Sequence, residues 1–282
     1  MILEDYRTYF KKQLAAIHPQ EEVEAITSIA LQYALKKSRV DIALARKEKL
    51  PVSQKNALDV ILERLLQAEP VQYITGTTQF YGLEFRVNSA TLIPRPETEE
   101  LVEWILAETS VAANTCRVLD IGTGSGCIAI SLAKNLSKAQ VGAIDVSTKA
   151  LETAKENALN NKVQIHFSKQ DILETSHLDT AYDVIVSNPP YVRELEKTEI
   201  KDNVLQHEPH TALFVDDKNP LVFYKKIAQL ARAHLKPEGQ LFFEINEYLG
   251  VETVAVVKEI GFSTVILKKD IFGKDRMIRA TL

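Results

Sequence analysis

The fold of this chain is decided by one stretch, Arg117-Val118-Leu119-Asp120-Ile121-Gly122-Thr123-Gly124-Ser125-Gly126. A short apolar strand ends here in a glycine-rich turn, and residues 125–136 continue with the periodicity of a helix. Glycine lets the backbone bend sharply and lets a ligand come close where a Cβ would interfere. Open α/β sheets bind ligands at the carboxyl ends of their strands, so this loop is the first candidate for a binding site.

Strands and helices alternate on the C-terminal side of this loop. Strands are expected at 140–144, 163–167, 182–186, 240–245, 263–268 and 277–281, and helices at 149–160 and 221–235. This alternation predicts an α/β fold with a mostly parallel, doubly wound sheet.

The first seventy residues have the pattern of helices. Apolar residues recur at steps of three and four in two runs, which are Leu3, Tyr6, Phe10, Leu14, Ile17 and then Val23, Ile26, Ala30. Ser53 is expected to cap a further helix, whose buried face would hold Ala57, Val60, Ile61 and Leu65. Because strand signals are absent and glycine is rare, residues 1–70 are predicted to form an all-helical bundle domain.

A connecting segment is expected between the bundle and the sheet. Pro70 would end the bundle, and residues 72–87 have β-type composition punctuated by Gly76 and Gly82. We therefore expect a β-hairpin linker over residues 71–90 and an α/β domain over 91–282. Within that domain, Pro94 disfavours helix before it, and the acidic residues 97, 99 and 100 suit the first turn of a helix that buries residues 101–106.

Composition narrows the possible partners. The chain has 282 residues, 45% of them apolar, with a formal net charge of −4. An acidic balance argues against a broad face for phosphate neutralisation, so no direct DNA binding is expected. Apolar runs are too short for a membrane span and no secretory leader is visible, which predicts a cytoplasmic protein with no membrane partner. Cys116 and Cys127 have no ligand spacing, so no metal is expected.

The spacing of the glycines helps to choose the ligand. A dinucleotide fingerprint requires Gly-x-Gly-x-x-Gly and a P-loop requires Gly-Lys-Ser/Thr, and neither is present. The form found here, with Asp120 two residues before the first glycine, resembles the first motif of class I methyltransferases. The resemblance implies S-adenosyl-L-methionine (SAM) as cofactor, with its methionine moiety at Gly122, Thr123, Gly124, Ser125 and Gly126.

Two further strand ends carry acidic residues. Asp145 ends the second strand, where a carboxylate can accept hydrogen bonds from both ribose hydroxyls of a nucleoside. NAD-binding proteins use the same geometry, so Asp145 alone does not choose the cofactor. By resemblance to class I methyltransferases, Asp171 would meet the adenine amino group and Ile172 would cover the ring.

The fourth strand leads into Asn188-Pro189-Pro190-Tyr191. The two prolines remove backbone donors and fix φ, so the Asn188 side chain and the Pro189 carbonyl are presented stiffly at the same sheet edge. Two such acceptors can bind both N–H groups of a planar nitrogen, and Tyr191 can lie against its planar face. A rigid turn is the simpler alternative, but the position after the fourth strand favours a catalytic clamp made of Asn188, Pro189, Pro190 and Tyr191, with Asn188 also beside the cofactor.

Several other segments resemble a single family, the release factor glutamine methyltransferases, also called HemK or PrmC. These segments lie at residues 72–76, 80–85, 93–99, 208–214 and 270–276. The resemblance implies a class I (Rossmann-like) methyltransferase domain that methylates the glutamine of the Gly-Gly-Gln motif in peptide chain release factors. It also implies that residues 93–99 lie beside the substrate pocket. Ile172 and the segment Glu244-Ile245-Asn246-Glu247 depart from the family pattern.

Other functions fit parts of the pattern. Asn-Pro-Pro-Tyr also occurs in N6-adenine methyltransferases and in ribosomal protein methyltransferases, and the domain could instead be an adaptor without activity. The short stretch 191–216 leaves little room for the target-recognition insert that an adenine methyltransferase would need. A monomeric release factor glutamine methyltransferase is therefore the predicted function.

Overall fold

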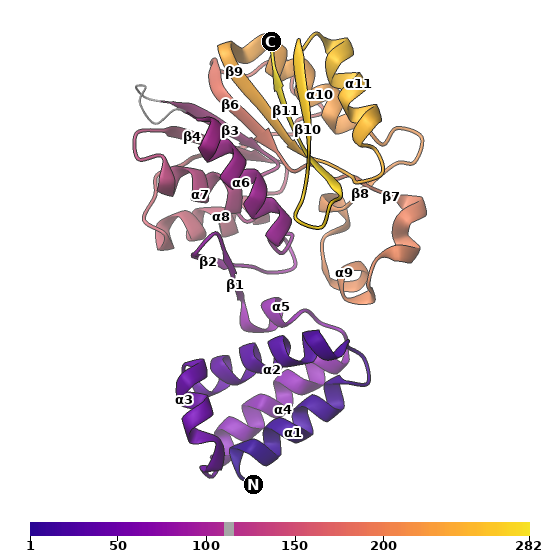
Figure 1. Ribbon diagram of the computed structural model, residues 1–282. Coiled ribbons are helices and arrows are strands. Elements are labelled where there is room, and N and C mark those ends of the chain that lie inside the picture. Colours follow the sequence, from indigo (N-terminus) through magenta and orange to yellow (C-terminus); the bar gives the residue numbers. More distant parts are fainter. Residues whose placement is uncertain (110–115) are drawn as a thin grey trace. The chain divides into compact units, whose positions relative to one another are not determined.

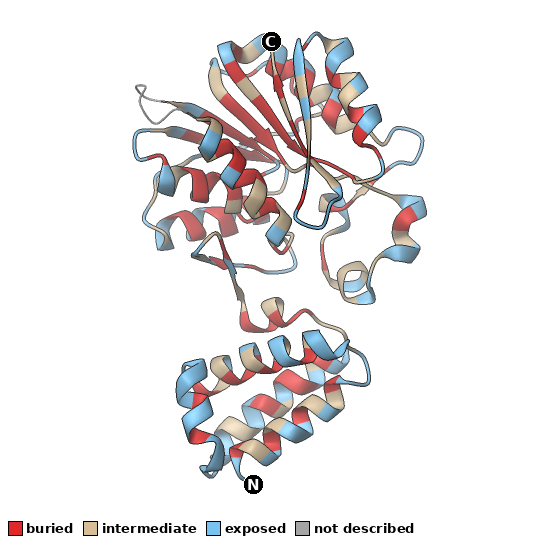
Figure 2. Ribbon diagram, in the orientation of Figure 1, coloured by how far each residue is buried: buried red, intermediate tan, exposed pale blue. Residues whose placement is uncertain are grey.

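The structure, a computed structural model, describes residues 1–109 and 116–282. The chain forms two compact units. The first combines Met1–Gly76 with Lys201–His207, and the second combines Thr77–Ile200 with Glu208–Leu282. Each unit has its own apolar core, as the distribution of buried residues shows (Figure 2).

The first unit is helical, as predicted. Its elements are α1 (Leu3–Leu14), α2 (Gln20–Leu35), α3 (Arg39–Leu44), the 3₁₀ turn η1 (Ala45–Lys47), α4 (Val52–Leu66), α5 (Val71–Thr75) and α9 (Asp202–His207) (Figure 1). Tyr6, Phe10 and Leu58 are fully buried in its core. The Tyr6 hydroxyl donates to Asp59 at 2.7 Å, which satisfies the polar end of a buried ring.

Three details of this unit correct the sequence prediction. Ile17 is 46% exposed because α1 ends at Leu14, before the predicted apolar stripe does. Pro51, rather than Ser53, precedes α4, and the buried face is rotated so that Leu58 and Leu62 replace Ala57 and Val60. Residues 71–75 form a helix rather than strand, because Pro70 suits a helix start and Gly76 ends the turn at φ +74°.

The second unit contains the predicted hairpin and sheet. The hairpin consists of β1 (Thr77–Phe80) and β2 (Leu83–Arg86). The seven-stranded sheet has the order β10-β11-β9-β6-β3-β4-β5. Its strands are β3 (Arg117–Ile121), β4 (Gln140–Asp145), β5 (His166–Lys169), β6 (Tyr182–Ser187), β9 (Leu235–Glu244), β10 (Thr264–Lys269) and β11 (Asp275–Thr281). Strands β9, β6, β3, β4 and β5 are parallel, and β11 is antiparallel to both of its neighbours.

Helices cover both faces of the sheet (Figure 1). One face packs on α6 (Pro96–Glu108), α7 (Cys127–Asn135) and α8 (Thr148–Asn160), and the other on α10 (Val222–His234) and α11 (Gly250–Ile260). Successive residues of β9 point to opposite faces: the Phe242 ring meets Trp104 of α6, and the Phe243 ring meets Tyr224 of α10. The doubly wound architecture is therefore confirmed.

One predicted strand begins later than expected. Val163 and Ile165 precede β5, which starts at His166. The Val163 N–H donates to the Ala158 carbonyl, so this residue closes the end of α8 and is not available to the sheet.

Between β6 and α10 the second unit carries short elements near the carboxyl edge of the sheet. They are β7 (Val192–Arg193), η2 (Glu194–Glu199), η3 (His210–Ala212) and β8 (Phe214–Val215), and β7 pairs with β8 in parallel. Within the described residues, no helix has the length and apolar character needed to cross a membrane.

Candidate active site

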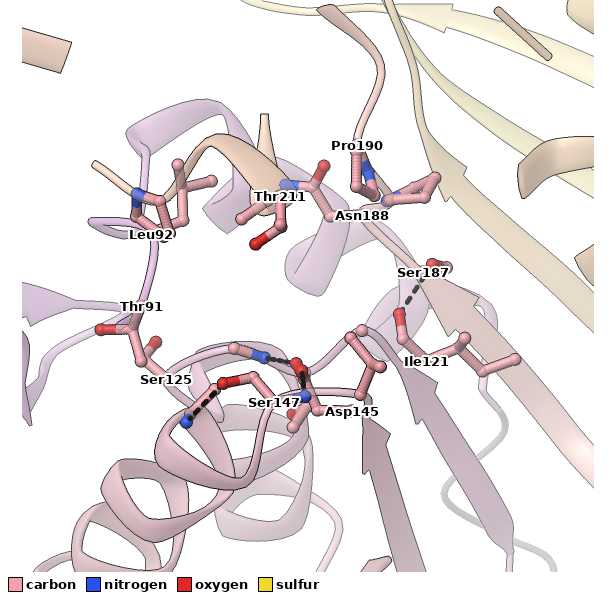
Figure 3. A pocket seen from close by; sticks show the side chains of 18 of the residues that line it. Thr91, Leu92, Ile121, Ser125, Asp145, Ser147, Ser187, Asn188, Pro190 and Thr211 are labelled. Atoms are coloured by element: carbon pink, nitrogen blue, oxygen red, sulfur yellow. Dashed lines mark hydrogen bonds between the residues drawn. The ribbon is translucent and has the colours of Figure 1, made fainter. Parts of the chain in front are cut away.

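A cavity of about 350 Å³ lies at the carboxyl edge of the parallel strands in the second unit. Its volume falls within the range of small-molecule sites, about 300–1,000 Å³. The lining combines the glycine loop, the ends of β4, β5 and β6, and two surrounding loops, at residues 89–92, 94, 95, 98, 121–125, 127, 128, 144–147, 149, 150, 170–172, 187–190, 209, 211, 212, 223 and 227. In Figure 3, Asn188 and Pro190 lie across the cavity from Asp145 and Ser147.

The glycine loop forms one wall of the cavity. Gly122, Gly124 and Gly126 all have positive φ, at +74°, +55° and +83°. The N–H groups of Gly122 and Thr123 both donate to the Ile144 carbonyl, which fixes the loop against β4. A Cβ on Gly122 or Gly124 would meet no atom of the described residues within 4 Å, so the loop leaves open space on its ligand side.

Asp145 connects the end of β4 to this loop. Its Oδ2 accepts the Gly124 N–H and its Oδ1 accepts the Ser147 N–H, each at 2.8 Å (Figure 3). Each carboxylate oxygen has a second lone pair, so the group can still accept from a ligand. The predicted neighbours Asp171 and Ile172 also line the cavity; Ile172 is buried, and Asp171 Oδ1 accepts the Leu173 N–H.

Asn188, Pro189 and Pro190 form the opposite wall. The preceding residue holds them in place, because the Ser187 hydroxyl donates to the Ile121 carbonyl at 2.7 Å and joins the ends of β6 and β3. The Asn188 Nδ2 donates to Thr98 Oγ1 at 3.4 Å. The structure thus brings Asn188, Pro189 and Pro190 to the same cavity as residues 122–125 of the predicted cofactor loop. Gly126, also predicted to bind the cofactor, is not among the described residues that line the cavity and packs against Ile130 and Ala154.

Tyr191 has a different setting from the rest of its motif. Among the described residues, Tyr191 is not one of those that line this cavity, and its ring packs against the core beside α10. Its hydroxyl donates to Glu244 Oε1 at 3.1 Å, and burial, followed by the nearby Glu244 charge, raises its pKa well above the ordinary range. That its ring covers the substrate stays a prediction.

The rim of the cavity is joined by an ion pair. Arg95 Nη2 donates to Glu208 Oε1 at 2.5 Å, and the Ile93 N–H donates to Glu208 Oε2 at 3.1 Å. The Glu208 side chain is 1% exposed and the Arg95 side chain is 33% exposed, so the carboxylate end of the pair is protected from solvent. It fixes the loop before α6 to the loop before β8, and residues of both loops line the cavity, as the family resemblance implied for residues 93–99.

Sequence reasoning did not single out Thr98 or Glu244 as site residues. Thr98 is buried near the start of α6, and its hydroxyl donates to Glu244 Oε2 at 2.7 Å. Glu244 follows a buried apolar run at the end of β9. This is the signal that identified Asp145 in β4, and applying it to β9 would have identified Glu244.

Burial also perturbs two groups near the loop. It raises the pKa of Asp120 to about 7, against smaller opposing contributions from the Thr123 hydroxyl and the Ala129 N–H. Burial likewise raises the pKa of the Cys127 thiol to about 12, so this residue at the start of α7 stays protonated and is a poor nucleophile.

Comparison with known proteins agrees with this geometry. Residues 5–76 match the family described as PrmC N-terminal domain, and residues 101–216 match the methyltransferase small domain. A release factor glutamine methyltransferase from Flavobacterium psychrophilum is 53% identical over 99% of both chains. This chain belongs to the release factor glutamine methyltransferase family.

Other relatives agree with that assignment. A member of this family from Bacteroides thetaiotaomicron is 45% identical over 96% of this chain and 97% of its own. A crystal structure of a methyltransferase from Pyrococcus furiosus covers 71% of this chain and 89% of its own, with a TM-score of 0.51 and 20% identity, which supports the fold alone. The predicted enzyme class, a methyltransferase, is confirmed.

Proposed function

We propose that this chain transfers a methyl group from SAM to the side-chain amide nitrogen of the glutamine in the Gly-Gly-Gln motif of peptide chain release factors. The single observation that carries the proposal is the placement of Asn188 across one cavity from the glycine loop, with Pro189 among the residues that line the same cavity. Membership of the release factor glutamine methyltransferase family supports the choice of a protein glutamine over a nucleobase.

The residues of the cavity fit SAM. The glycine loop offers open space beside Gly122 and Gly124 for the methionine moiety. Asp145 has acceptor capacity for the ribose hydroxyls, and Asp171 with Ile172 would meet the adenine. When bound, SAM supplies a methyl group on a positively charged sulfur, which is a strong electrophile.

The chain's own contribution is to position a weak nucleophile. An amide nitrogen shares its lone pair with the carbonyl and carries two N–H donors. If Asn188 Oδ1 and the Pro189 carbonyl accept one N–H each, the nitrogen is held with a face toward the cofactor. Holding reacting atoms about 3–3.5 Å apart can contribute about 7–11 kcal/mol to lowering the barrier.

The same two oxygens stabilise the charge that develops. As the N–C bond forms, the bond between the methyl carbon and the cofactor sulfur would break and leave its electron pair on that sulfur, which becomes a neutral thioether. Positive charge would grow on the nitrogen, and both acceptors would bind it more strongly. The methylated nitrogen is then acidic and releases one proton to solvent, so no strong base is required before transfer. The product is a neutral secondary amide.

The helical unit is proposed to recognise the protein substrate, with residues 1–70 as the recognition domain and 71–90 as the linker to the catalytic domain at 91–282. The match of residues 5–76 to a domain of this family supports a separate N-terminal helical domain. A folded protein partner also agrees with the net charge of −4, which does not favour nucleic acid. We expect the enzyme to act as a cytoplasmic monomer.

Transfer of label tests the function directly. Purified enzyme is incubated with SAM labelled in the methyl group and with purified release factor, and the modified residue is located by mass spectrometry. We expect one methyl group on the glutamine of Gly-Gly-Gln. Label that persists after replacement of that glutamine by alanine, or label that enters duplex DNA instead, would refute the proposal.

The clamp is tested by Asn188→Ala. We expect kcat to fall about 100-fold or more because one of two acceptors for the reacting nitrogen is lost. Binding of SAM, measured by equilibrium dialysis, should change little. Asn135→Ala is a matched control, since the Asn135 amide donates to Ser131 on α7 away from the cavity. Unchanged activity in Asn188→Ala would exclude the clamp even if release factor is the substrate.

A further inference from the structure

The Asn188 side chain can serve the clamp in only one of its two amide orientations. With Oδ1 toward the cavity, it accepts an N–H of the glutamine amide. Turned by 180°, it presents its own NH₂ donors to the N–H donors of the substrate, and the clamp is lost. Some contact must therefore fix the orientation of this amide before the substrate arrives.

We propose that Glu244 and Thr98 are positioning residues that hold the Asn188 amide with its oxygen facing the cavity, an inference that rests on the proposed function. The contacts form one chain: Asn188 Nδ2 to Thr98 Oγ1 at 3.4 Å, and Thr98 Oγ1 to Glu244 Oε2 at 2.7 Å. These two hydrogen bonds connect three elements, since Asn188 follows β6, Thr98 is in α6 and Glu244 ends β9.

The donor and acceptor roles in these two hydrogen bonds follow from the number of hydrogens that the Thr98 hydroxyl carries. A threonine hydroxyl has one hydrogen, and here it is donated to the carboxylate of Glu244. Toward Asn188, the Thr98 oxygen can then act only as an acceptor, and only the NH₂ end of Asn188 can face it. Consequently Asn188 Oδ1 is directed away from Thr98 and is left for the substrate.

The setting of Glu244 suits a fixed acceptor. Glu244 is 1% exposed, and its two carboxylate oxygens accept separate donors, Thr98 Oγ1 and the Tyr191 hydroxyl. Burial raises the pKa of Glu244, and the hydrogen bond from Thr98, the charge of Arg276 and the hydrogen bond from Tyr191 oppose that effect in part. Glu244 thereby holds both the first and the last residue of Asn188-Pro189-Pro190-Tyr191, one through Thr98 and one directly.

The test compares Thr98→Val, which keeps the shape of the side chain and removes the hydroxyl, with Thr98→Ser, which keeps the hydroxyl. Thr253→Val is the matched control, because it removes an equally buried hydroxyl whose bond is to the Leu249 carbonyl within α11. For each variant, kcat and KM for release factor, the Kd for SAM and the thermal midpoint are measured.

We expect Thr98→Val to lower kcat about five- to tenfold, the effect of one lost hydrogen bond, with KM and the Kd for SAM changed less than twofold. Thr98→Ser should stay within about twofold of the wild type. Thr253→Val should lower the thermal midpoint as much as Thr98→Val does, without the fall in kcat. Equal kcat in Thr98→Val and Thr253→Val would overturn the inference.

A double-mutant cycle separates positioning from general damage. Glu244→Gln can donate to the Thr98 oxygen, so the Thr98 hydroxyl is free to turn its hydrogen toward Asn188 and to favour the wrong amide orientation. We expect Glu244→Gln to lower kcat at least as much as Thr98→Val, and the double variant to lose no more than the larger single effect. Additive losses would show that the two residues act independently and would overturn the inference.

The activity of the wild type distinguishes a failure of the proposed function from a failure of the positioning inference. If the wild type does not methylate release factor, the proposed function fails. If it does, and Asn188→Ala is inactive while Thr98→Val and Glu244→Gln keep full kcat, only the positioning inference fails.

Discussion

Asp120 is a fully buried carboxyl group at the end of β3, just before the glycine loop. Its Oδ2 accepts the Thr123 hydroxyl and the Ala129 N–H, while Oδ1 has no hydrogen-bond partner among the residues that the structure describes. Burial raises its pKa from 3.8 to about 7. The folded protein therefore binds this proton more tightly than the unfolded chain does.

The sign of the resulting pH dependence follows from linkage. A raised pKa contributes stability that is fully present below about pH 4 and is lost as pH rises to about 7. We expect the free energy of unfolding of the catalytic unit to fall by on the order of 4 kcal/mol from this group across that interval. Asp120→Asn should flatten the dependence, since asparagine has no charge to bury.

Urea unfolding at several pH values measures this effect. The fluorescence of Trp104, the one tryptophan of the chain, reports on α6 in the catalytic unit. Other groups also titrate in this range, so the informative quantity is the difference between wild type and Asp120→Asn. Parallel curves for the two proteins would contradict a shifted pKa at Asp120.

At the junction of β3 and α7, Gly126 and Gly124 are required for different reasons, one for helix packing and the other for ligand space. A Cβ at Gly126 would lie 2.9 Å from Ile130 Cδ1 and 3.2 Å from Ala154 Cβ, so Gly126 is required for helix packing. A Cβ at Gly124 would meet no protein atom within 4 Å and would enter the space left for the ligand. Both positions have positive φ, which adds strain for alanine.

Alanine at these two positions is therefore expected to have different effects, mainly on stability at Gly126 and mainly on SAM binding at Gly124. We expect Gly126→Ala to lower stability by about 2–4 kcal/mol through strain and overpacking. Gly124→Ala should cost about 1 kcal/mol in stability but should weaken SAM binding at least tenfold. Denaturant unfolding and equilibrium dialysis provide the two readouts. A stability loss in Gly124→Ala that exceeds the loss in Gly126→Ala would contradict these separate roles.

Some features of this site could be predicted from the sequence, and others could not. The strand-loop-helix at Gly122 and the segment at Asn188 have local signatures, and parallel strands bring their carboxyl ends to one edge, so both were placed together correctly. The contacts of Glu244 with Thr98 and of Glu208 with Arg95 join residues more than a hundred positions apart. No local periodicity encodes such pairs, so they required the structure.

In the whole molecule, the helical unit consists of two separate segments of the chain. Lys201–His207 belongs to that unit, although the residues on both sides of it belong to the catalytic unit. Lys201 forms an ion pair with Glu22 and lowers its pKa, and a His207 ring nitrogen lies 3.2 Å from the Gln67 carbonyl oxygen. The next residue, Glu208, forms the ion pair with Arg95 at the rim of the cavity.

Because residues 201–207 belong to the helical unit, we expect them to respond when that unit is destabilised and not when the catalytic unit is. Leu58→Ala truncates a fully buried side chain of the helical core and should cost about 2–5 kcal/mol there. Leu230→Ala makes the same change in α10 of the catalytic unit. Amide hydrogen exchange, read by mass spectrometry, follows both units in the full chain.

We expect exchange in residues 201–207 to accelerate in Leu58→Ala together with α1, α2 and α4, while β3 and β6 stay protected. In Leu230→Ala, exchange should accelerate in α10 and leave 201–207 close to the wild type. The opposite pattern would mean that this segment opens with the catalytic unit. The expected pattern would mean that the stability of the helical unit controls an element one residue away from Glu208, and so from the rim of the cavity.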